Sequence, residues 1–260
     1  MLSKNKIKFI KSLDNKKTRD ELGQFIIQGD KVVSEFINAG WNINLLVAQT
    51  RWTETLPEHA LQNIEEIIDV EYNELKKISS HKTPHNVLAV VEKPEFLINW
   101  NEIMNSLTLV LETIQDPGNL GTIIRTAAWF GISNIICSQD SVDVFNPKVV
   151  QASMGAILRV KVFYNNLFDF MKKISESNFP VYGASLDGMP VYDCDLNANG
   201  IILLGNESAG ISSSLEKYIT QKIRIPCFSD ITEGIDSLNI SIAAAILCSE
   251  FRRATRGYSK

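Results

Sequence analysis

The sequence lacks the features that mark several well-known classes of protein. No apolar run approaches the roughly 20 residues that cross a membrane, and the N-terminal stretch MLSKNKIKFIKSLDNKK has no signal-peptide region with a small-residue cleavage site. The four cysteines are widely separated and form no CxxC pair, which argues against a zinc site and a disulfide framework. We therefore expect a soluble cytoplasmic protein with buried, reduced thiols and no metal.

Motifs of common enzyme classes are also missing. There is no GxxxxGK[ST] phosphate loop, and no GxGxxG after a strand, which excludes the dinucleotide fingerprint and the usual glycine-rich loop of common methyltransferases. Pro84 interrupts the spacing between His81 and His85, so these two and His59 do not predict a helical metal pair. The serines near GNESAG have neither a neighbouring histidine nor a GxSxG elbow, so serine hydrolysis is a poor fit.

Length and composition predict an ordinary globular protein with an uneven charge distribution. The 260 residues are 45% hydrophobic and 22% charged, which suits one large domain or two ordinary ones. The formal net charge of −4 argues mildly against a nucleic-acid partner. Residues 1–31, however, carry eight basic and four acidic side chains, a local excess of four. This segment either neutralises phosphates or forms a solvated helix face.

Apolar patterning predicts two domains joined by a linker. Residues 1–95 read as a small α/β unit, with strands at 25–27, 45–48 and 87–91 and a helix at 31–39. Residues 96–106 read as a connection. The third region, 107–260, alternates strands and helices. Its strands are expected at 107–114, 132–138, 160–164, 180–186, 201–205 and 222–226, and its helices around 121–130, 147–157, 167–177, 212–219 and 238–253.

This alternation predicts an α/β fold with a parallel sheet and helices on both faces. Ligands of such sheets bind outside the carboxyl ends of the strands. Polar side chains follow three of those ends: Asn119, Arg125, Glu207, Ser237 and Asn239. Taken singly they are explained by turn chemistry or by a solvated arginine, but together they indicate a site. We expect Ser237 to be the N-cap of the last helix and Asn119 to help cap the helix that carries Arg125.

Four segments carry a resemblance to a known family. NLGTIIRTA, FNPKVVQASMGAILRVKVF, LLGNESAGIS and SLNISIAAAI, in that order and spacing, resemble the SpoU (TrmH) family of RNA ribose 2′-O-methyltransferases in the SPOUT superfamily. The match spans 107–253. FIIQGDKVVSEF and HKTPHNVLAVV resemble the small ribosomal-protein-like RNA substrate-binding domain of many members. The chain departs from that pattern at Gln28 and at His85-Asn86, which concerns the choice of RNA and not the reaction.

The resemblance implies the rest of the architecture and the cofactor. The parallel sheet would end in a C-terminal trefoil knot that forms an S-adenosylmethionine pocket, and the protein would be a homodimer with the site at the subunit interface. The cofactor-binding residues that it implies, several of them acting through backbone groups, are Ala184, Leu204, Gly205, Asn206, Ile225 and Leu238. A knotted pocket would explain why no glycine fingerprint is present.

The resemblance also implies catalytic roles for Asn119, Arg125, Glu207, Ser237 and Asn239. Because the pKa of arginine is above about 12, the free side chain stays protonated and cannot act as a general base. Arg125 is therefore either an activated base or the group that positions phosphate and 2′-hydroxyl, and we favour positioning with electrostatic stabilisation of the alkoxide. Glu207 would pair with Arg125 or bind the target nucleotide. Lys148 is either a phosphate contact or a surface lysine.

The expected function is methylation of a ribose 2′-hydroxyl in ribosomal RNA, because members with this N-terminal domain often act there and the tRNA enzymes usually lack it. One alternative is a tRNA ribose 2′-O-methyltransferase. The other is a non-catalytic RNA-binding ribosome-assembly protein, against which the five intact polar residues argue. The segment CFSDITEGID, between Pro226 and Ser237, is longer than the family's usual loop and is expected to affect access to the pocket or the fit of the RNA.

Overall fold

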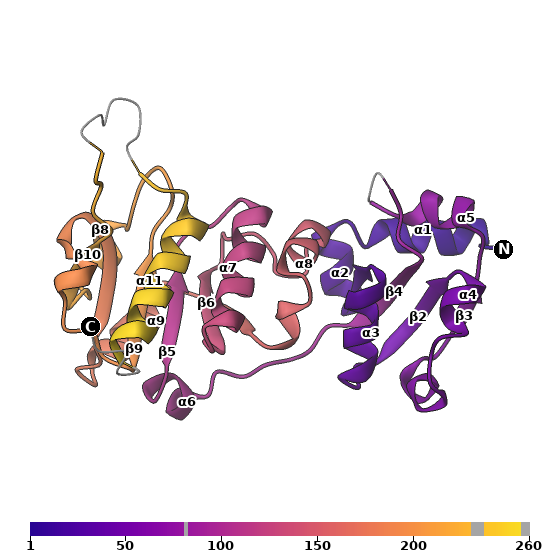
Figure 1. The fold of residues 1–260 in the computed structure, drawn as a ribbon, viewed down its shortest axis with the longest axis horizontal. Coiled ribbons are helices and arrows are strands. Elements are labelled where there is room, and N and C mark those ends of the chain that lie inside the picture. The colour runs from indigo at the N-terminus through magenta and orange to yellow at the C-terminus, as the bar shows by residue number, and fades with distance from the viewer. Residues whose placement is uncertain (81–82, 230–236, 256–260) are drawn as a thin grey trace. The chain divides into compact units, whose positions relative to one another are not determined.

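The chain forms two compact units. The computed structural model describes residues 1–80, 83–229 and 237–255 (Figure 1). The first unit contains Met1–Glu95 and Asp143–Leu158, and the second contains Phe96–Val142 and Arg159–Lys260. His81 and most of the loop between Pro226 and Ser237 lie outside the described residues.

The first unit is built on a four-stranded sheet. Its strand order is β1 (Gln24–Gln28), β4 (Val87–Glu92), β2 (Ile43–Ala48) and β3 (Ile67–Asp69). The central strand β4 runs antiparallel to both neighbours, and β2 and β3 run parallel. Three of these strands match the predicted ones. The fourth, β3, was not predicted because its three residues are too few to show a strand period.

Helices surround this sheet, and two of them come from the middle of the sequence. The helices are α1 (Lys4–Ser12), α2 (Lys16–Leu22), α3 (Asp30–Asn38), α4 (Thr50–Thr53), η1 (Glu58–Asn63), α5 (Tyr72–Ile78), α8 (Pro147–Ser153) and η2 (Ala156–Leu158). Helix α8 contacts β1. Lys148 is exposed on α8, and its role as a phosphate contact stays a prediction.

A buried ion pair ties residues 143–158 to the first unit. Arg19 donates from Nε and Nη2 to Oδ2 of Asp143, at 2.9 and 2.6 Å, and its Nη1 donates to the carbonyl of Leu13 at 2.8 Å. Both charged side chains are buried. Removing one partner of such a pair lowers the free energy of unfolding by about 3–5 kcal/mol, because the other charge stays buried without a partner. The pair therefore specifies where this segment packs.

The second unit is built on a six-stranded sheet in which every neighbouring pair is parallel. The strand order is β10 (Gln221–Arg224), β8 (Val181–Pro190), β9 (Gly200–Leu204), β5 (Leu107–Leu111), β6 (Asn134–Ser138) and β7 (Lys161–Asn165). All six predicted strands are present. The central strands β5 and β9 are buried at every position, as strands covered on both faces should be.

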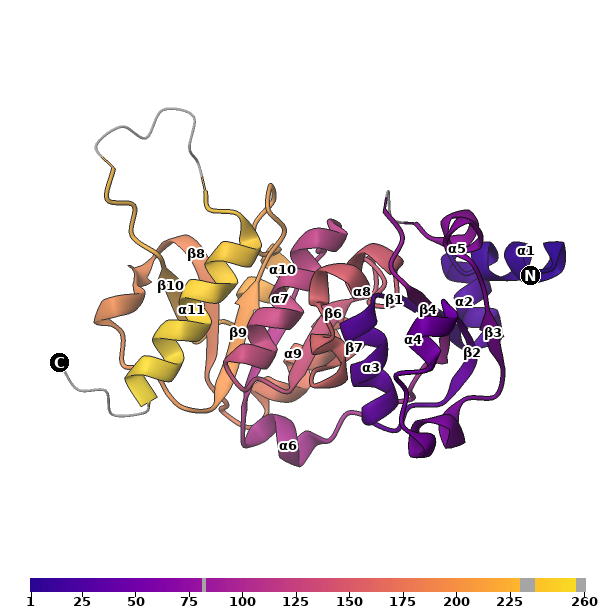
Figure 2. The same ribbon diagram turned by 45° about the vertical axis from the view of Figure 1, so that its right-hand side comes forward.

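Helices cover both faces of this sheet, as the alternation predicted. Helix α9 (Leu167–Ser175) packs in a core with Val181. Successive strand side chains point to opposite faces, so Tyr182 lies on the other face, where its ring meets Phe251 of α11 (Ile240–Thr255) at 4.8 Å. Helices α11 and α7 (Pro117–Trp129) lie side by side (Figures 1 and 2).

Three short helices complete the second unit: α6 (Trp100–Met104), η3 (Val191–Asp193) and α10 (Ser213–Glu216). Helix α6 lies within the predicted linker. Its five residues are too few to show a helical period, and the Asn99 side chain caps it by accepting from the amide of Glu102 at 3.2 Å.

The cysteines only partly match the expectation of buried thiols. All four are free, but Cys227 is exposed and Cys194 is half-buried, so the expectation is wrong for these two. Cys137 and Cys248 are buried, and burial raises the pKa of the Cys248 thiol to about 12. Among the described residues, no group of three side chains is arranged to hold a metal, and no helix has the length and hydropathy of a membrane span.

Candidate active site

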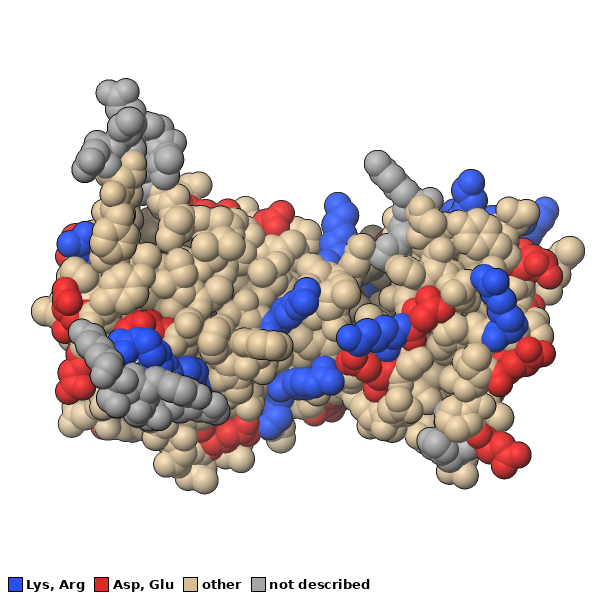
Figure 3. All heavy atoms as spheres, viewed as in Figure 1, with Lys and Arg blue, Asp and Glu red and all other residues tan. Residues whose placement is uncertain are grey.

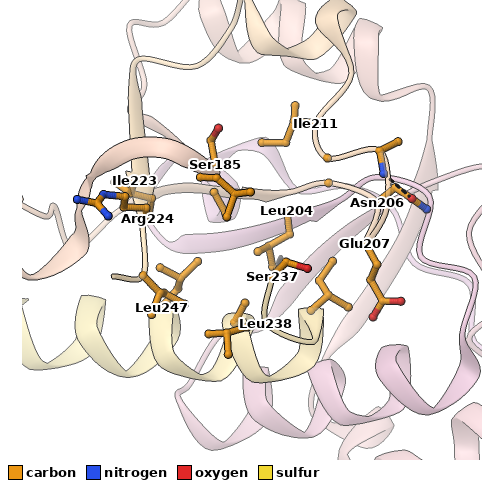
Figure 4. Close-up of a pocket in the computed structure, with 18 of the residues that line it drawn as sticks. Ser185, Leu204, Asn206, Glu207, Ile211, Ile223, Arg224, Ser237, Leu238 and Leu247 are labelled. Atoms are coloured by element: carbon orange, nitrogen blue, oxygen red, sulfur yellow. Dashed lines mark hydrogen bonds between the residues drawn. The ribbon is translucent and has the colours of Figure 1, made fainter. Parts of the chain in front are cut away.

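A cavity of about 540 Å³ lies between β8, the carboxyl ends of β9 and β10, and the first turns of α11 (Figure 4). Its volume falls within the range of small-molecule sites, about 300–1,000 Å³. Apolar side chains such as Ile211, Ile223 and Leu247 form much of the wall. All six residues predicted to bind a cofactor line it: Ala184, Leu204, Gly205, Asn206, Ile225 and Leu238.

The loop after β9 is folded tightly against itself at the edge of this cavity. Asn206 and Gly210 exchange two backbone hydrogen bonds, at 3.0 and 2.9 Å. A Cβ atom on Gly205 would lie 2.2 Å from the carbonyl carbon of Gly210, so no side chain fits there. The Asn206 Oδ1 accepts from the amides of Ser208 and Ala209, and its Nδ2 donates to the carbonyl of Thr113. Asn206 therefore shapes the loop through its side chain.

Three predicted catalytic residues form one hydrogen-bonded group. Asn119 Nδ2 donates to Oε1 of Glu207 at 2.6 Å. Asn239 Nδ2 donates to Oδ1 of Asn119 at 3.0 Å and also lies 3.3 Å from Oε1 of Glu207. Because both amides donate toward Oε1, they hold the Glu207 side chain in one place beside the cavity, which it lines.

The helix caps at this site differ from those predicted. Helix α7 begins at Pro117, and its N-cap is Asp116, whose Oδ1 accepts from the amide of Asn119 at 2.8 Å. At the start of α11, Oδ1 of Asn239 accepts from the amides of Ser241 and Ile242 at 3.0 and 3.4 Å. Asn239 is therefore the cap, and the prediction of Ser237 was wrong. Because Asp116 caps α7, the Asn119 side chain is not needed as a cap and can donate to Glu207.

Ser241 is a residue that the sequence did not single out. It is buried, and its hydroxyl donates to Oδ1 of Asn239 at 2.6 Å. Since Oδ1 is thus turned toward α11, the Nδ2 group of Asn239 is left to face Asn119 and Glu207. A serine two residues beyond an asparagine cap is a weak signal, because it also suits an ordinary helix start.

Arg125 stands apart from this group. Its side chain is exposed on α7, it does not line the cavity of its own chain, and it forms no hydrogen bond or ion pair with any residue that the structure describes. The suggested Arg125–Glu207 ion pair is therefore not present. Ser237 lines the cavity near Leu238 (Figure 4).

Two charged residues that line the cavity were not predicted from the sequence. Arg224 lies at the opposite end of the cavity from Glu207 (Figure 4). Asp187 also lines the cavity. Its carboxylate accepts hydrogen bonds from Ser185, which has the larger effect, and from Lys222, and these hold its pKa below the usual value. Arg224 falls inside a predicted strand, and Asp187 follows the predicted strand 180–186 as a single acidic residue, so no polar motif marked either of them.

Comparison with known proteins supports the resemblance in both units. The sequence model of the SpoU rRNA Methylase family matches residues 106–249, and that of the MRM3-like substrate binding domain matches residues 4–89. The chain is 26% identical to the 23S rRNA (guanosine(2553)-2'-O)-methyltransferase RlmP of Bacillus subtilis (strain 168), over 95% of this chain and 96% of that one.

Two solved structures are similar along nearly the whole chain. One is a protein from Porphyromonas gingivalis assigned to the TrmH family of RNA methyltransferases, which is 39% identical with a TM-score of 0.83, over 97% of this chain and 99% of that one. The other is an AdoMet-bound rRNA methyltransferase from Sinorhizobium meliloti, which is 29% identical with a TM-score of 0.86, over 98% and 97%.

Proposed function

Because the chain belongs to the SpoU rRNA methylase family, we propose that it transfers a methyl group from S-adenosylmethionine to a ribose 2′-hydroxyl of ribosomal RNA. The observation that carries this proposal is the apolar cavity beside the locked Glu207. Two similar proteins add support, since one is named as a 23S rRNA 2′-O-methyltransferase and the other binds AdoMet. The expected site is in the second unit, with the first unit as the RNA-binding domain and 96–106 between them.

The cavity fits S-adenosylmethionine in size and in chemistry. Its apolar wall suits the flat adenine ring, and the absence of room for a side chain at Gly205 brings backbone groups to the surface of the cavity. Backbone groups at Leu204, Ile225 and Leu238 would hold the adenosyl part. When bound, the cofactor supplies an electrophilic methyl group on a sulfonium centre. The Glu207 carboxylate, kept in place by two amides, would favour that positive charge.

Arg125 would act on the RNA and not on the cofactor. A guanidinium binds a phosphate bidentately and stays charged at any working pH. Held beside the target ribose, it would orient the 2′-hydroxyl and stabilise the negative charge that develops on the 2′-oxygen as its proton leaves. The second N–H of the Asn119 amide, together with Ser237, would hold the ribose edge, while Asn239 would act by holding Asn119 and Glu207 in place.

We propose that the site is completed in a homodimer. An exposed Arg125 that neither lines its own cavity nor forms a hydrogen bond or ion pair with a described residue is what a site shared between two copies would show. Exposed apolar side chains lie on the two adjacent helices, with Trp129 84% exposed on α7 and Ile242 50% exposed on α11. Figure 3 shows a mostly uncharged surface where α7 and the first half of α11 lie. A trefoil knot in the C-terminal segment belongs to the same proposal.

The first unit supplies charge for RNA binding. Lys4, Lys8 and Lys11 are spaced along one face of α1 and are exposed, and none of them forms an ion pair with a described residue. Such a row can neutralise phosphates. The match of residues 4–89 to a substrate binding domain supports this role. The proposed location is the cytoplasm.

The decisive test is transfer of labelled methyl from S-adenosylmethionine to unmodified ribosomal RNA and, separately, to unmodified tRNA, followed by nucleoside analysis. We expect 2′-O-methyl nucleoside from ribosomal RNA, and loss of that product in Arg125→Ala with cofactor binding retained. If only tRNA yields the 2′-O-methyl nucleoside, the substrate is tRNA and not ribosomal RNA. No cofactor binding by the native protein would overturn the catalytic proposal in favour of an RNA-binding role.

A further inference from the structure

A second cavity, of about 280 Å³, lies at the carboxyl ends of β5, β6 and β7. It occupies the other half of the same sheet edge that forms the cofactor cavity. Ligands of parallel sheets bind at this edge. The second cavity is much more polar than the first, since amides, hydroxyls and carboxylates follow all three strands. Neither the family motifs nor the proposed cofactor accounts for it.

Hydrogen bonds join the residues between the two cavities into a shared wall. Asn206 lines the cofactor cavity, and its Nδ2 donates at 3.0 Å to the carbonyl of Thr113, which lines the second cavity. On the same wall, Oε2 of Glu112 accepts from the amide of Ser212 at 2.9 Å. A ligand in the second cavity would therefore lie next to the ribose that is methylated at the first.

The side chains of the second cavity offer free hydrogen-bonding groups. Gln139 and Asn165 both line it, and neither side chain hydrogen-bonds to a residue that the structure describes. Asp140 lies beside them, and hydrogen bonds from Ser138 and then from Thr113 hold its pKa below the usual value. Asp140 thus stays an ionised acceptor. Amides and carboxylates are the groups that read the edges of nucleobases.

An aromatic ring and a cation complete the set. Phe168 lines the cavity and remains 38% exposed. The Nζ of Lys217 lies 4.5 Å from the centroid of that ring, and Lys217 forms no ion pair with any described residue. Exposed aromatic rings stack on unpaired bases, and a lysine beside the ring can meet the phosphate of the same nucleotide.

Backbone strain marks the same cavity. Thr113 has a φ of 56°, which is rare for a β-branched residue. The conformation is held by two bonds: the Thr113 amide donates to Oγ of Ser138 at 2.8 Å, and its hydroxyl donates to Oδ2 of Asp140 at 2.9 Å. Strained residues that their surroundings hold in place cluster at ligand sites.

We propose that this second cavity binds a nucleotide of the RNA that neighbours the methylated one, with its base against Phe168 and its edge read by Gln139, Asp140 and Asn165. Because an ionised carboxylate only accepts hydrogen bonds, Asp140 would face a donor on the edge of the base, either an exocyclic amino group or a ring N–H. Lys217 provides the cation for its phosphate. The inference rests on the proposed function and assigns part of the RNA specificity to this cavity.

The test compares two variants, Phe168→Ala and the double variant Gln139→Ala/Asn165→Ala, with the native protein. RNA affinity is measured by filter binding to unmodified ribosomal RNA, KM and kcat by methyl transfer, and S-adenosylmethionine affinity by calorimetry. Phe96→Ala is the matched control, because Phe96 is 40% exposed in the same unit but does not line the cavity. Tm reports the folding of each variant.

We expect each cavity variant to raise the RNA Kd and KM by about 5- to 150-fold, the loss that follows removal of one stacked or hydrogen-bonded base. The S-adenosylmethionine Kd should not change, and Phe96→Ala should match the native protein. Asp140→Asn, which replaces an acceptor oxygen by a donor, should also weaken RNA binding.

The outcomes separate this inference from the proposed function. Folded variants with native RNA Kd and KM overturn the inference while leaving methyl transfer intact. Weakened RNA binding in the variants, without methyl transfer by the native protein, supports the cavity and overturns the proposed reaction. A native protein that binds no RNA overturns both.

Discussion

Replacing Asn239 by aspartate separates the two tasks of this side chain. Its Oδ1 caps α11 by accepting from Ser241 and Ile242, and its Nδ2 donates toward Asn119 and Glu207. Aspartate keeps the capping oxygen but has no amide donor. It also places a second negative charge beside the Glu207 carboxylate. Alanine removes both tasks, so the pair Asn239→Asp and Asn239→Ala distinguishes stability from catalysis.

The structure sets the expected magnitudes. Loss of an N-cap costs about 1 kcal/mol, so Asn239→Ala should lower Tm by about 2–4 °C for a unit of this size. In Asn239→Asp the cap remains, and the added charge at the N-terminus of α11 contributes about 0.3–1 kcal/mol. This offsets the repulsion from Glu207, so its Tm should stay within about 2 °C of the native value.

Activity should behave differently. A hydrogen bond to a charged group contributes about 1.5–3 kcal/mol, and every 1.36 kcal/mol is a tenfold change in rate. Both variants should therefore lose about 10- to 150-fold in kcat/KM for methyl transfer. Tm by calorimetry and initial rates at saturating S-adenosylmethionine measure the two effects. Full activity in Asn239→Asp would refute the idea that the amides hold Glu207 for the reaction.

Three further predictions concern the RNA and cofactor contacts. Arg125→Lys keeps the charge but loses bidentate binding, so kcat should fall at least tenfold with an unchanged S-adenosylmethionine Kd; native kcat would contradict the positioning role. Changing Lys4, Lys8 and Lys11 together to glutamine should reduce the slope of log Kd for RNA against log salt concentration by about 2–3, and an unchanged slope would place the phosphate contacts elsewhere. Gly205→Ala should abolish cofactor binding in calorimetry and destabilise the fold by about 1–3 kcal/mol, because the added Cβ would lie 2.2 Å from a backbone atom; normal binding would exclude the proposed cavity.

Much of the fold was predictable from local pattern. Apolar runs predicted all six parallel strands of the second unit, of which β5 and β9 are buried at every position, and the periodic segments predicted α7, α9 and α11. Short elements such as β3 and α6 were missed because three to five residues are too few to show a period. The ion pair of Arg19 with Asp143, 124 residues apart, was equally invisible, since neither residue has a local reason to find the other.

The candidate site was also predictable only in part. Motifs in the sequence selected the residues, and all six predicted cofactor positions line one cavity. They did not assign the hydrogen bonds. Asp116, which precedes Pro117, and Asn239, two residues beyond the predicted Ser237, are the helix caps. With those caps filled, Asn119 is free to bind Glu207.

The sequence by itself determined the class of fold, the family and the kinds of side chain brought to the sheet edge, because these depend on short-range pattern and residue type. Only the tertiary structure decided which side chains meet. Asn119 lies 88 residues from Glu207 and 120 from Asn239, and the three touch because parallel strands place their carboxyl ends at one edge. Hydrogen bonding acts only within about 3.5 Å, so its partners depend on the path of the whole chain.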